Sequence, residues 1–204
     1  DTDRRITDFN PAAERLFEEP PFTGARRLKV NPDAPQRHVR IEALRRGCVV
    51  FVPTPRLRGG FKRLDPASIP DDETKPAASL SKMDRWAEPV TIASSGGRSS
   101  RATGSVAVTS GGHRCGKGEG YSDREYAILR ELGHDPVPVA TTVHSRQRVA
   151  SVPTDPHDLP LARIVTPEQT IDVADPPAPP TGIDWTALSA ADLEEMPVLR
   201  ELRG

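Results

Sequence analysis

The residues best suited to chemistry lie in one glycine-rich stretch, Gly111 to Tyr126, which reads G-G-H-R-C-G-K-G-E-G-Y-S-D-R-E-Y. The stretch holds five of the chain's 15 glycines, together with the cations Arg114 and Lys117. Glycines allow backbone N–H groups to approach an anion closely, and cations neutralise its charge. The stretch therefore predicts a phosphate-binding loop. The glycines expected to contact the phosphates through their backbone are Gly116, Gly118 and Gly120.

This loop nearly matches two common phosphate-binding signatures and completes neither of them. Gly111 to Lys117 fits G-x-x-x-x-G-K, but Gly118 stands where a P-loop has the Ser or Thr hydroxyl that contacts magnesium. The last three glycines give G-x-G-x-G instead of the G-x-G-x-x-G of a dinucleotide-binding turn. A tight glycine-rich turn without a ligand therefore remains the alternative interpretation.

Two blocks of the sequence resemble those of a known family. Gly112 to Arg124 is similar to the G-x-R-x-G-x-G-x-G-Y-x-D-R loop of 5-formyltetrahydrofolate cyclo-ligases, and Pro153 to Thr166 is similar to their P-x-x-P-H-D-x-P-x-D-x-I-V-T block. The chain most resembles the divergent branch called methenyltetrahydrofolate synthetase domain-containing proteins. That branch carries G-K-G-E-G-Y, N-P-D-x-P-Q and P-T-P-R-L-R, which here are Gly116 to Tyr121, Asn31 to Gln36 and Pro53 to Arg58.

The resemblance implies an ATP- and magnesium-dependent cyclisation of 5-formyltetrahydrofolate to 5,10-methenyltetrahydrofolate, with ATP and a reduced folate as small-molecule partners. It assigns catalytic roles to Arg114, Lys117 and Tyr121, and metal binding to Asp123 and Asp158. The implied nucleotide-binding residues are Gly116, Lys117, Gly118, Glu119, Gly120 and Tyr121. Glu119 and Ser122 depart from the cyclo-ligase loop, where glycine and an aromatic residue usually stand.

A strand–helix–strand pattern near the N-terminus is expected to position part of the site. Strands are predicted at Arg27 to Val30 and at Cys48 to Val52, with a helix from Gln36 to Arg46 between them. This order is typical of a parallel βαβ unit, in which ligands collect at the carboxyl ends of the strands. Asn31 and the segment Thr54 to Arg58 are therefore expected beside the ligand.

The rest of the chain supports a three-layer α/β domain with a largely parallel sheet, cyclo-ligase-like, over residues 1–173. The Ser/Gly/Arg-rich segment 93–103 is typical of a flexible linker, or of a locally shortened central strand. Further strands are predicted at Gly104 to Thr109, Val137 to Val143, Arg148 to Val152 and, last, Ala162 to Thr166. Further helical segments are predicted at Asn10 to Phe17, Lys82 to Ala87 and Tyr126 to Leu132.

Residues 174–204 are predicted to form a C-terminal extension. A proline-rich connector, Asp175 to Pro180, precedes an amphipathic segment, Asp184 to Leu202, which Pro197 must break. We expect this segment to dock on the main domain, and a helix that binds a partner is the alternative.

Four cations, Arg56, Arg58, Lys62 and Arg63, lie within eight residues around Phe61. They predict an anion cradle for phosphates or for a folate's glutamate tail, with Arg56, Arg58 and Phe61 binding the substrate. A solvated basic loop, with Phe61 in the core, is the alternative.

Composition limits the classes of function. The net charge of -1 over 204 residues gives no general attraction to nucleic acid, although the basic run permits contact with RNA. Two cysteines form no disulfide scaffold, and no apolar run is long enough to span a bilayer, so a cytoplasmic location is expected. The chain does not begin with Met, which is compatible with missing N-terminal sequence. A non-catalytic nucleotide-binding or RNA-associated module, and an ATP-dependent enzyme with another substrate, remain alternative functions.

Overall fold

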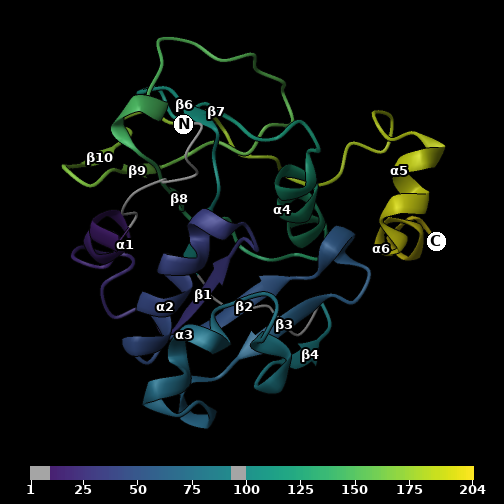
Figure 1. Ribbon diagram of the computed structural model, residues 1–204. Helices are drawn as coiled ribbons and strands as arrows, with labels where there is room; N and C mark the ends of the chain where they lie inside the picture. Colours follow the sequence, from purple (N-terminus) through teal and green to yellow (C-terminus); the bar gives the residue numbers. More distant parts are fainter. Residues whose placement is uncertain (1–9, 93–99) are drawn as a thin grey trace.

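The computed structural model describes residues 10–92 and 100–204, and an eight-stranded sheet lies at its centre (Figure 1). The strand order is β10-β9-β8-β5-β1-β2-β3-β4. The five parallel strands in the middle are β9 (Arg163–Val165), β8 (Val139–Thr142), β5 (Ser100–Thr103), β1 (Arg27–Val30) and β2 (Val49–Pro53). The antiparallel strands at the edges are β10 (Thr170–Asp172), β3 (Phe61–Leu64) and β4 (Glu88–Val90). A separate two-stranded sheet pairs β6 (Ala107–Val108) with β7 (Arg114–Cys115).

Helices cover both faces of the large sheet. The α-helices are α1 (Asn10–Leu16), α2 (Arg37–Arg45), α3 (Thr74–Ala77), α4 (Tyr121–Glu131), α5 (Ala190–Glu195) and α6 (Pro197–Arg203). Short 3-10 segments are η1 (Ala34–Gln36), η2 (Pro55–Leu57), η3 (Pro66–Ser68), η4 (Asp71–Glu73), η5 (Met83–Arg85) and η7 (Ser145–Gln147). No described helix is long and apolar enough to cross a membrane.

Alternate side chains of β2 show the three layers directly. Val50 and Val52 belong to the core cluster that packs against α1, α2 and α3. Phe51, between them, belongs to the cluster with residues of α4 and the C-terminal helices. Successive side chains of a strand point to opposite faces, so the sheet is buried on both sides. The predicted three-layer α/β fold with a largely parallel sheet is confirmed.

The N-terminal βαβ unit is also confirmed. β1 and β2 are parallel neighbours, and η1 with α2 forms the connection between them. Gly47 follows this helix with φ of +75°, and Gly133 follows α4 with φ of +81°. Glycine adopts this left-handed conformation at low cost, which explains why both helices end where the sequence predicts.

Several expected elements differ in the structure. The flexible-linker prediction for 93–103 is wrong at Ser100–Thr103, which forms β5 between β1 and β8, while residues 93–99 lie outside the described ranges. Of the strand expected from Gly104 to Thr109, only β6 forms, and the strand expected at Arg148 to Val152 is reduced to one bridge between Arg148 and Val108. The strands β3, β4 and β10 were not predicted.

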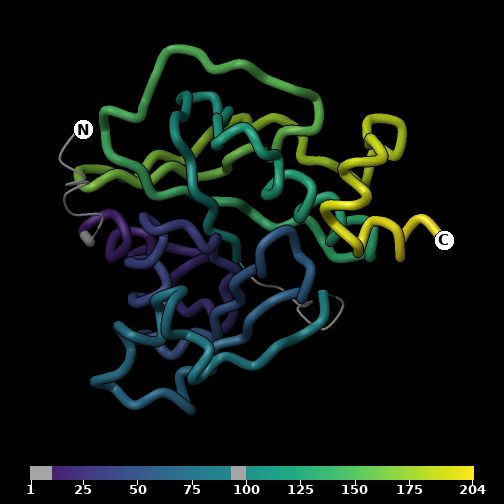
Figure 2. The backbone as a smooth tube through the Cα atoms, turned by 45° about the vertical axis from the view of Figure 1, so that its right-hand side comes forward, coloured from purple at the N-terminus to yellow at the C-terminus, as the bar shows by residue number. Residues whose placement is uncertain are grey.

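The C-terminal extension packs against α4 and the β2–β3 end of the sheet, as the ribbon and the backbone tube show (Figures 1 and 2). Met196 and Leu199 are 0% and 1% exposed, in one cluster with Phe51, Ile128 and Leu129. The predicted docking and the predicted break at Pro197, which begins α6, are both confirmed. The division of the chain at 173/174 remains a prediction.

Leu199→Val should lower the free energy of unfolding by about 1 kcal/mol, because it removes one buried methylene from this contact. Chemical denaturation measures this change. Leu80→Val is the matched control, since Leu80 is 47% exposed and should lose much less. Equal losses in the two variants would contradict the docking.

Candidate functional site

A cavity of about 1570 Å³ lies at the carboxyl ends of the central parallel strands. Asn31 follows β1, Thr54 follows β2 and Gly104 follows β5, and all three line the cavity together with Thr142 at the end of β8. β1 has β2 as its neighbour on one side and β5 on the other. The chain continues from β1 to β2 and later crosses back to β5, so the direction in which strands are added reverses at β1. Open α/β sheets bind ligands at such a crevice. The positions expected for Asn31 and Thr54 are confirmed.

The glycine-rich loop forms one wall of the cavity and leads directly into α4. Gly118 and Gly120 have φ of +92° and +65°, values that a residue with a side chain adopts only at a cost. The backbone N–H groups from Gly116 to Gly120 form no hydrogen bond with any described residue. These donors stand beside the first turn of α4, whose dipole favours negative charge. The loop has the properties of an anion-binding site.

Arg114 and Asp123 form an ion pair at the base of this loop. Arg114, on β7, is 7% exposed, and its Nη2 donates to Asp123 Oδ1. The same carboxylate oxygen accepts from the backbone N–H of Leu159 at 2.9 Å. Gly120, not Asp123, occupies the N-cap position of α4, so the structural role of Asp123 is ion pairing and not capping.

The contact with Leu159 brings the second sequence block to the glycine-rich loop. Asp158 precedes Leu159 and lines the same cavity as Asp123. Asp158 Oδ2 also accepts from the N–H of Asp155 at 2.8 Å, which fixes the turn. The structure thus brings the two expected metal-binding carboxylates to one cavity. Across the described ranges, no group of three or more His, Cys, Asp or Glu side chains suits a metal ion.

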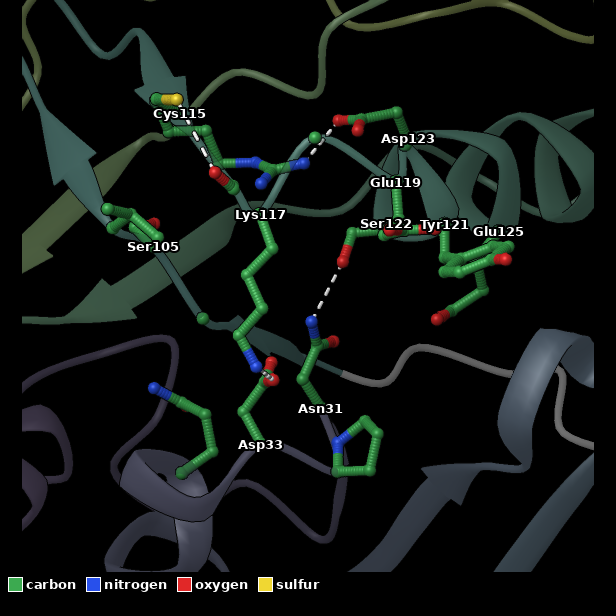
Figure 3. Close-up of a pocket in the computed structure, with 18 of the residues that line it drawn as sticks. Asn31, Asp33, Ser105, Cys115, Lys117, Glu119, Tyr121, Ser122, Asp123 and Glu125 are labelled. Carbon is green, nitrogen blue, oxygen red and sulfur yellow. Dashed lines mark hydrogen bonds and ion pairs between the residues drawn. The ribbon is translucent and has the colours of Figure 1, made fainter.

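Lys117 extends from the loop to Asp33 on the opposite wall of the cavity (Figure 3). Its Nζ lies 2.8 Å from Asp33 Oδ1, and this hydrogen bond raises the pKa of Lys117. The lysine side chain is 73% exposed. An added Cβ on Gly104 would lie 2.8 Å from Asp33 Oδ2, so the glycine leaves room for the carboxylate. Lys117 therefore stands at the cavity with its charge already paired.

Three buried charged residues, Lys29, Arg101 and Glu125, form an ion-pair network next to the cavity. Lys29 Nζ lies 2.8 Å from Glu125 Oε2, and Arg101 Nη1 lies 3.4 Å from Glu125 Oε1. The three side chains are 5% to 10% exposed, and burial lowers the pKa of Lys29 and of Arg101. Glu125 lines the cavity and belongs to α4, so the network ties this helix to the ends of β1 and β5.

Hydrogen bonds also connect the loop after β1 to the start of α4. Asn31 Nδ2 donates to Ser122 Oγ at 2.8 Å and to Thr103 Oγ1 at 3.2 Å (Figure 3). Arg40, on α2, holds the same loop because its Nη1 donates to the Asn31 carbonyl at 2.6 Å. Ser122, a departure from the cyclo-ligase loop, thus has a defined structural partner.

The four cations of the basic run do not lie together, because only Arg56 lines the cavity. Arg56 lines the cavity, and its Nε donates to Tyr121 Oη at 3.0 Å. Tyr121 Oη in turn donates to Glu195 Oε2 at 2.8 Å, and this hydrogen bond raises the pKa of Tyr121. Arg58 lies outside the cavity lining, and its Nε donates to the Glu195 carbonyl at 3.4 Å.

The expected anion cradle is therefore not assembled as a unit. Lys62 pairs with Asp84, and Arg63 pairs with Asp65 and Glu88, because both cations lie on β3 beside acidic residues. Phe61 is 1% exposed, belongs to the cluster of Met196 and Leu57, and does not line the cavity. Stacking of Phe61 on a substrate ring, as predicted, is wrong because the sheet and the C-terminal helices cover the ring.

Several cavity residues carry chemistry that the sequence did not single out. Gln36 is fully buried, and its Nε2 donates to Thr142 Oγ1 at 3.0 Å, while its Oε1 has no partner among the described residues. His144 Nδ1 accepts from the N–H of Arg146 at 3.1 Å, which leaves Nε2 as the donor of the neutral ring. Gln36 lies in the N-P-D-x-P-Q block, which was the available signal, whereas no pattern distinguished His144 or Glu195.

These features define an open α/β protein with a cavity at its topological switch point and a glycine-rich loop on one wall. The chain belongs to the 5-formyltetrahydrofolate cyclo-ligase family, since a sequence model of that family matches residues 1–167.

Known proteins agree with this assignment. The chain is 40% identical to the methenyltetrahydrofolate synthase domain-containing protein of Mus musculus, over 98% of this chain and 56% of that protein. It is 34% identical to the protein of the same name from Homo sapiens, over 98% of this chain and 54% of the relative. The chain thus spans a little over half of the length of these relatives.

A solved structure has the same fold. The NMR structure of Aquifex aeolicus 5,10-methenyltetrahydrofolate synthetase matches with a TM-score of 0.53 and 19% identity, over 82% of this chain and 81% of that one.

Proposed function

We propose that the protein catalyses the ATP-dependent cyclisation of 5-formyltetrahydrofolate to 5,10-methenyltetrahydrofolate. The single observation that carries this proposal is the glycine-rich loop, whose N–H groups from Gly116 to Gly120 have no described acceptor and line the cavity. Family membership supplies the substrate class. A cytoplasmic location is part of the proposal, and it is supported by two cysteines that form no disulfide.

The reaction consists of two displacements. The formyl oxygen first attacks the γ-phosphorus of ATP, and ADP leaves. N10 then attacks the activated formyl carbon and releases its proton to solvent, and the C–O bond breaks to release inorganic phosphate. The chain's task is to position the two substrates and to neutralise charge at the transferred phosphoryl group. We assign this task to the loop N–H groups, to Arg114 and to Lys117, whose side chain extends from the loop towards Asp33.

The carboxylates of the cavity fit a magnesium ion. Magnesium takes oxygen ligands and is commonly held by one or two carboxylates together with substrate phosphates and waters. Asp123 and Asp158 line the cavity on the side of the loop, which satisfies this requirement. When bound, the ion would neutralise phosphate charge during the transfer.

Lys117→Ala should weaken ATP binding about tenfold, near the lower limit for a hydrogen bond to a charged group. The effect is at this lower limit because Lys117 is 73% exposed and must also leave Asp33. Isothermal calorimetry with ATP and magnesium measures the change. Lys62→Ala is the control, since Lys62 also pairs with an aspartate but lies outside the cavity lining. Equal ATP affinity in the wild type and Lys117→Ala would remove Lys117 from the site.

A second candidate function is a nucleotide-binding module without turnover. Glu119 favours it, because this acid lines the cavity within the loop itself and forms no ion pair with any described residue. A carboxylate there repels phosphate oxygens unless a cation lies between them. ATP binding without formation of methenyltetrahydrofolate would support this second candidate.

A further inference from the structure

The C-terminal extension places a carboxylate against two residues that line the cavity. Glu195 is the last residue of α5, and the matched family region ends before it, at residue 167. Its Oε2 accepts from Tyr121 Oη at 2.8 Å, and its Oε1 lies 3.6 Å from Arg56 Nη2. Tyr121 and Arg56 both line the cavity. Glu195 therefore contacts two cavity residues from a part of the chain that is far away in sequence.

Other contacts hold the extension in this position. Arg124, one turn after Tyr121 on α4, pairs with Asp192 of α5 at 2.6 Å. Glu131, at the end of α4, accepts from the N–H of Ile183 at 3.0 Å. Met196, next to Glu195, is fully buried and lines the cavity. These contacts hold the carboxylate of Glu195 against Arg56 and Tyr121, behind the residues that line the cavity.

The backbone also holds Arg56 in place. Arg56 and Leu57 have φ of 56° and 53°, a left-handed conformation that costs free energy in residues other than glycine. Such a conformation persists only where surrounding contacts impose it. Leu57 is 5% exposed in the cluster of Met196, while the Arg56 guanidinium meets Tyr121 and Glu195.

We propose that Glu195 is a specificity-determining residue of the cavity: it neutralises Arg56, so this wall accepts uncharged hydrogen-bonding groups of a ligand and disfavours carboxylates and phosphates. A guanidinium has five N–H donors, so Arg56 can contact Tyr121 and Glu195 and still donate to a carbonyl, a hydroxyl or a ring nitrogen. A phosphate at the same place would have to approach the carboxylate of Glu195 and compete with it. The anionic part of a ligand is thereby directed to the glycine-rich loop.

This inference rests on the proposed function only in taking the cavity as the ligand site, and inorganic triphosphate tests it without turnover. Glu195→Gln should bind triphosphate about three- to fivefold more tightly than the wild type in calorimetry, the scale of one half-exposed ion pair. Arg56→Gln in the Glu195→Gln background should abolish that gain. Glu194→Gln is the matched control, because Glu194 is the neighbouring acid of α5 and pairs with Arg200, outside the cavity.

The results separate this inference from the proposed function. Tighter triphosphate binding in Glu195→Gln, reversed by Arg56→Gln, supports it whether or not the wild type forms methenyltetrahydrofolate. Equal triphosphate affinity in Glu195→Gln and the wild type overturns it. A wild type without turnover contradicts only the proposed enzyme.

Discussion

Asp123→Asn is expected to lower the rate of methenyltetrahydrofolate formation by about 10²-fold or more, the scale of losing one preorganised electrostatic group. The carboxylate lies in the cavity beside the loop and holds Arg114 in place. Asparagine keeps a carbonyl oxygen that can accept from the Leu159 N–H, but it loses the charge. The variant therefore loses both a candidate metal ligand and the partner that positions Arg114. Absorbance of the product under saturating ATP and magnesium measures the effect.

The variant should also be less stable, because Arg114 is buried and loses its counter-charge. The rate must therefore be expressed per folded molecule, with the folded fraction determined by circular dichroism. Glu131→Gln is the matched control, since it makes the same chemical change on the same helix, α4, outside the cavity lining. Full turnover in folded Asp123→Asn would exclude a catalytic contribution of the carboxylate.

Glu125→Ala is expected to reduce the free energy of unfolding by about 3–5 kcal/mol, the usual cost of breaking a buried ion pair. Glu125 is 4% exposed and is the acid that Lys29 and Arg101 share. Its removal leaves two buried cations without a counter-charge. Urea denaturation measures the loss. Glu42→Ala is the control, because Glu42 pairs with Arg46 at the surface and should lose no more than about 1 kcal/mol.

The deficit of Glu125→Ala should become smaller as the pH rises. Burial already lowers the pKa of Lys29, and loss of Glu125 lowers it further. The unfolded chain keeps the lysine proton up to the ordinary pKa of 10.5, whereas the folded variant releases it at lower pH. Between the pKa of Lys29 in the folded variant and the higher pKa in the folded wild type, only the variant has released this proton, so its free energy of unfolding increases with pH relative to the wild type. A deficit that stays constant over this range would mean that Lys29 remains charged.

The sequence predicts those elements that local chemistry determines. Gly47 and Gly133 end their helices through a positive φ, and Pro197 separates two helices because it cannot continue the first one. β5 is predicted only as a locally shortened central strand, the alternative to a flexible linker, because its four residues, Ser100 to Thr103, have no apolar alternation. Its strand conformation comes from pairing with β1 and β8 on either side, and the charge of Arg101 is compensated by Glu125 from α4.

In the candidate site, too, some features follow from local sequence and others only from tertiary contacts. The glycines of the loop and their positive φ angles follow from a continuous stretch of sequence. The partners of its charged residues do not, because Lys117 meets Asp33 and Tyr121 meets Glu195 only after the sheet and the extension are assembled. Phe61 illustrates the converse error, since its position among cations suggested stacking on a ligand, while the alternation of β3 directs it into the core.

The most direct test of the proposed function is the formation of methenyltetrahydrofolate by the wild-type protein supplied with 5-formyltetrahydrofolate, ATP and magnesium. Product absorbance and released phosphate should increase in a one-to-one ratio, and both should stop when ATP or magnesium is omitted. Under the same conditions Lys117→Ala should require a higher ATP concentration, while Lys62→Ala should not. Binding of ATP and magnesium without any product, in a folded wild-type protein, would contradict the proposed enzyme and leave a nucleotide-binding module.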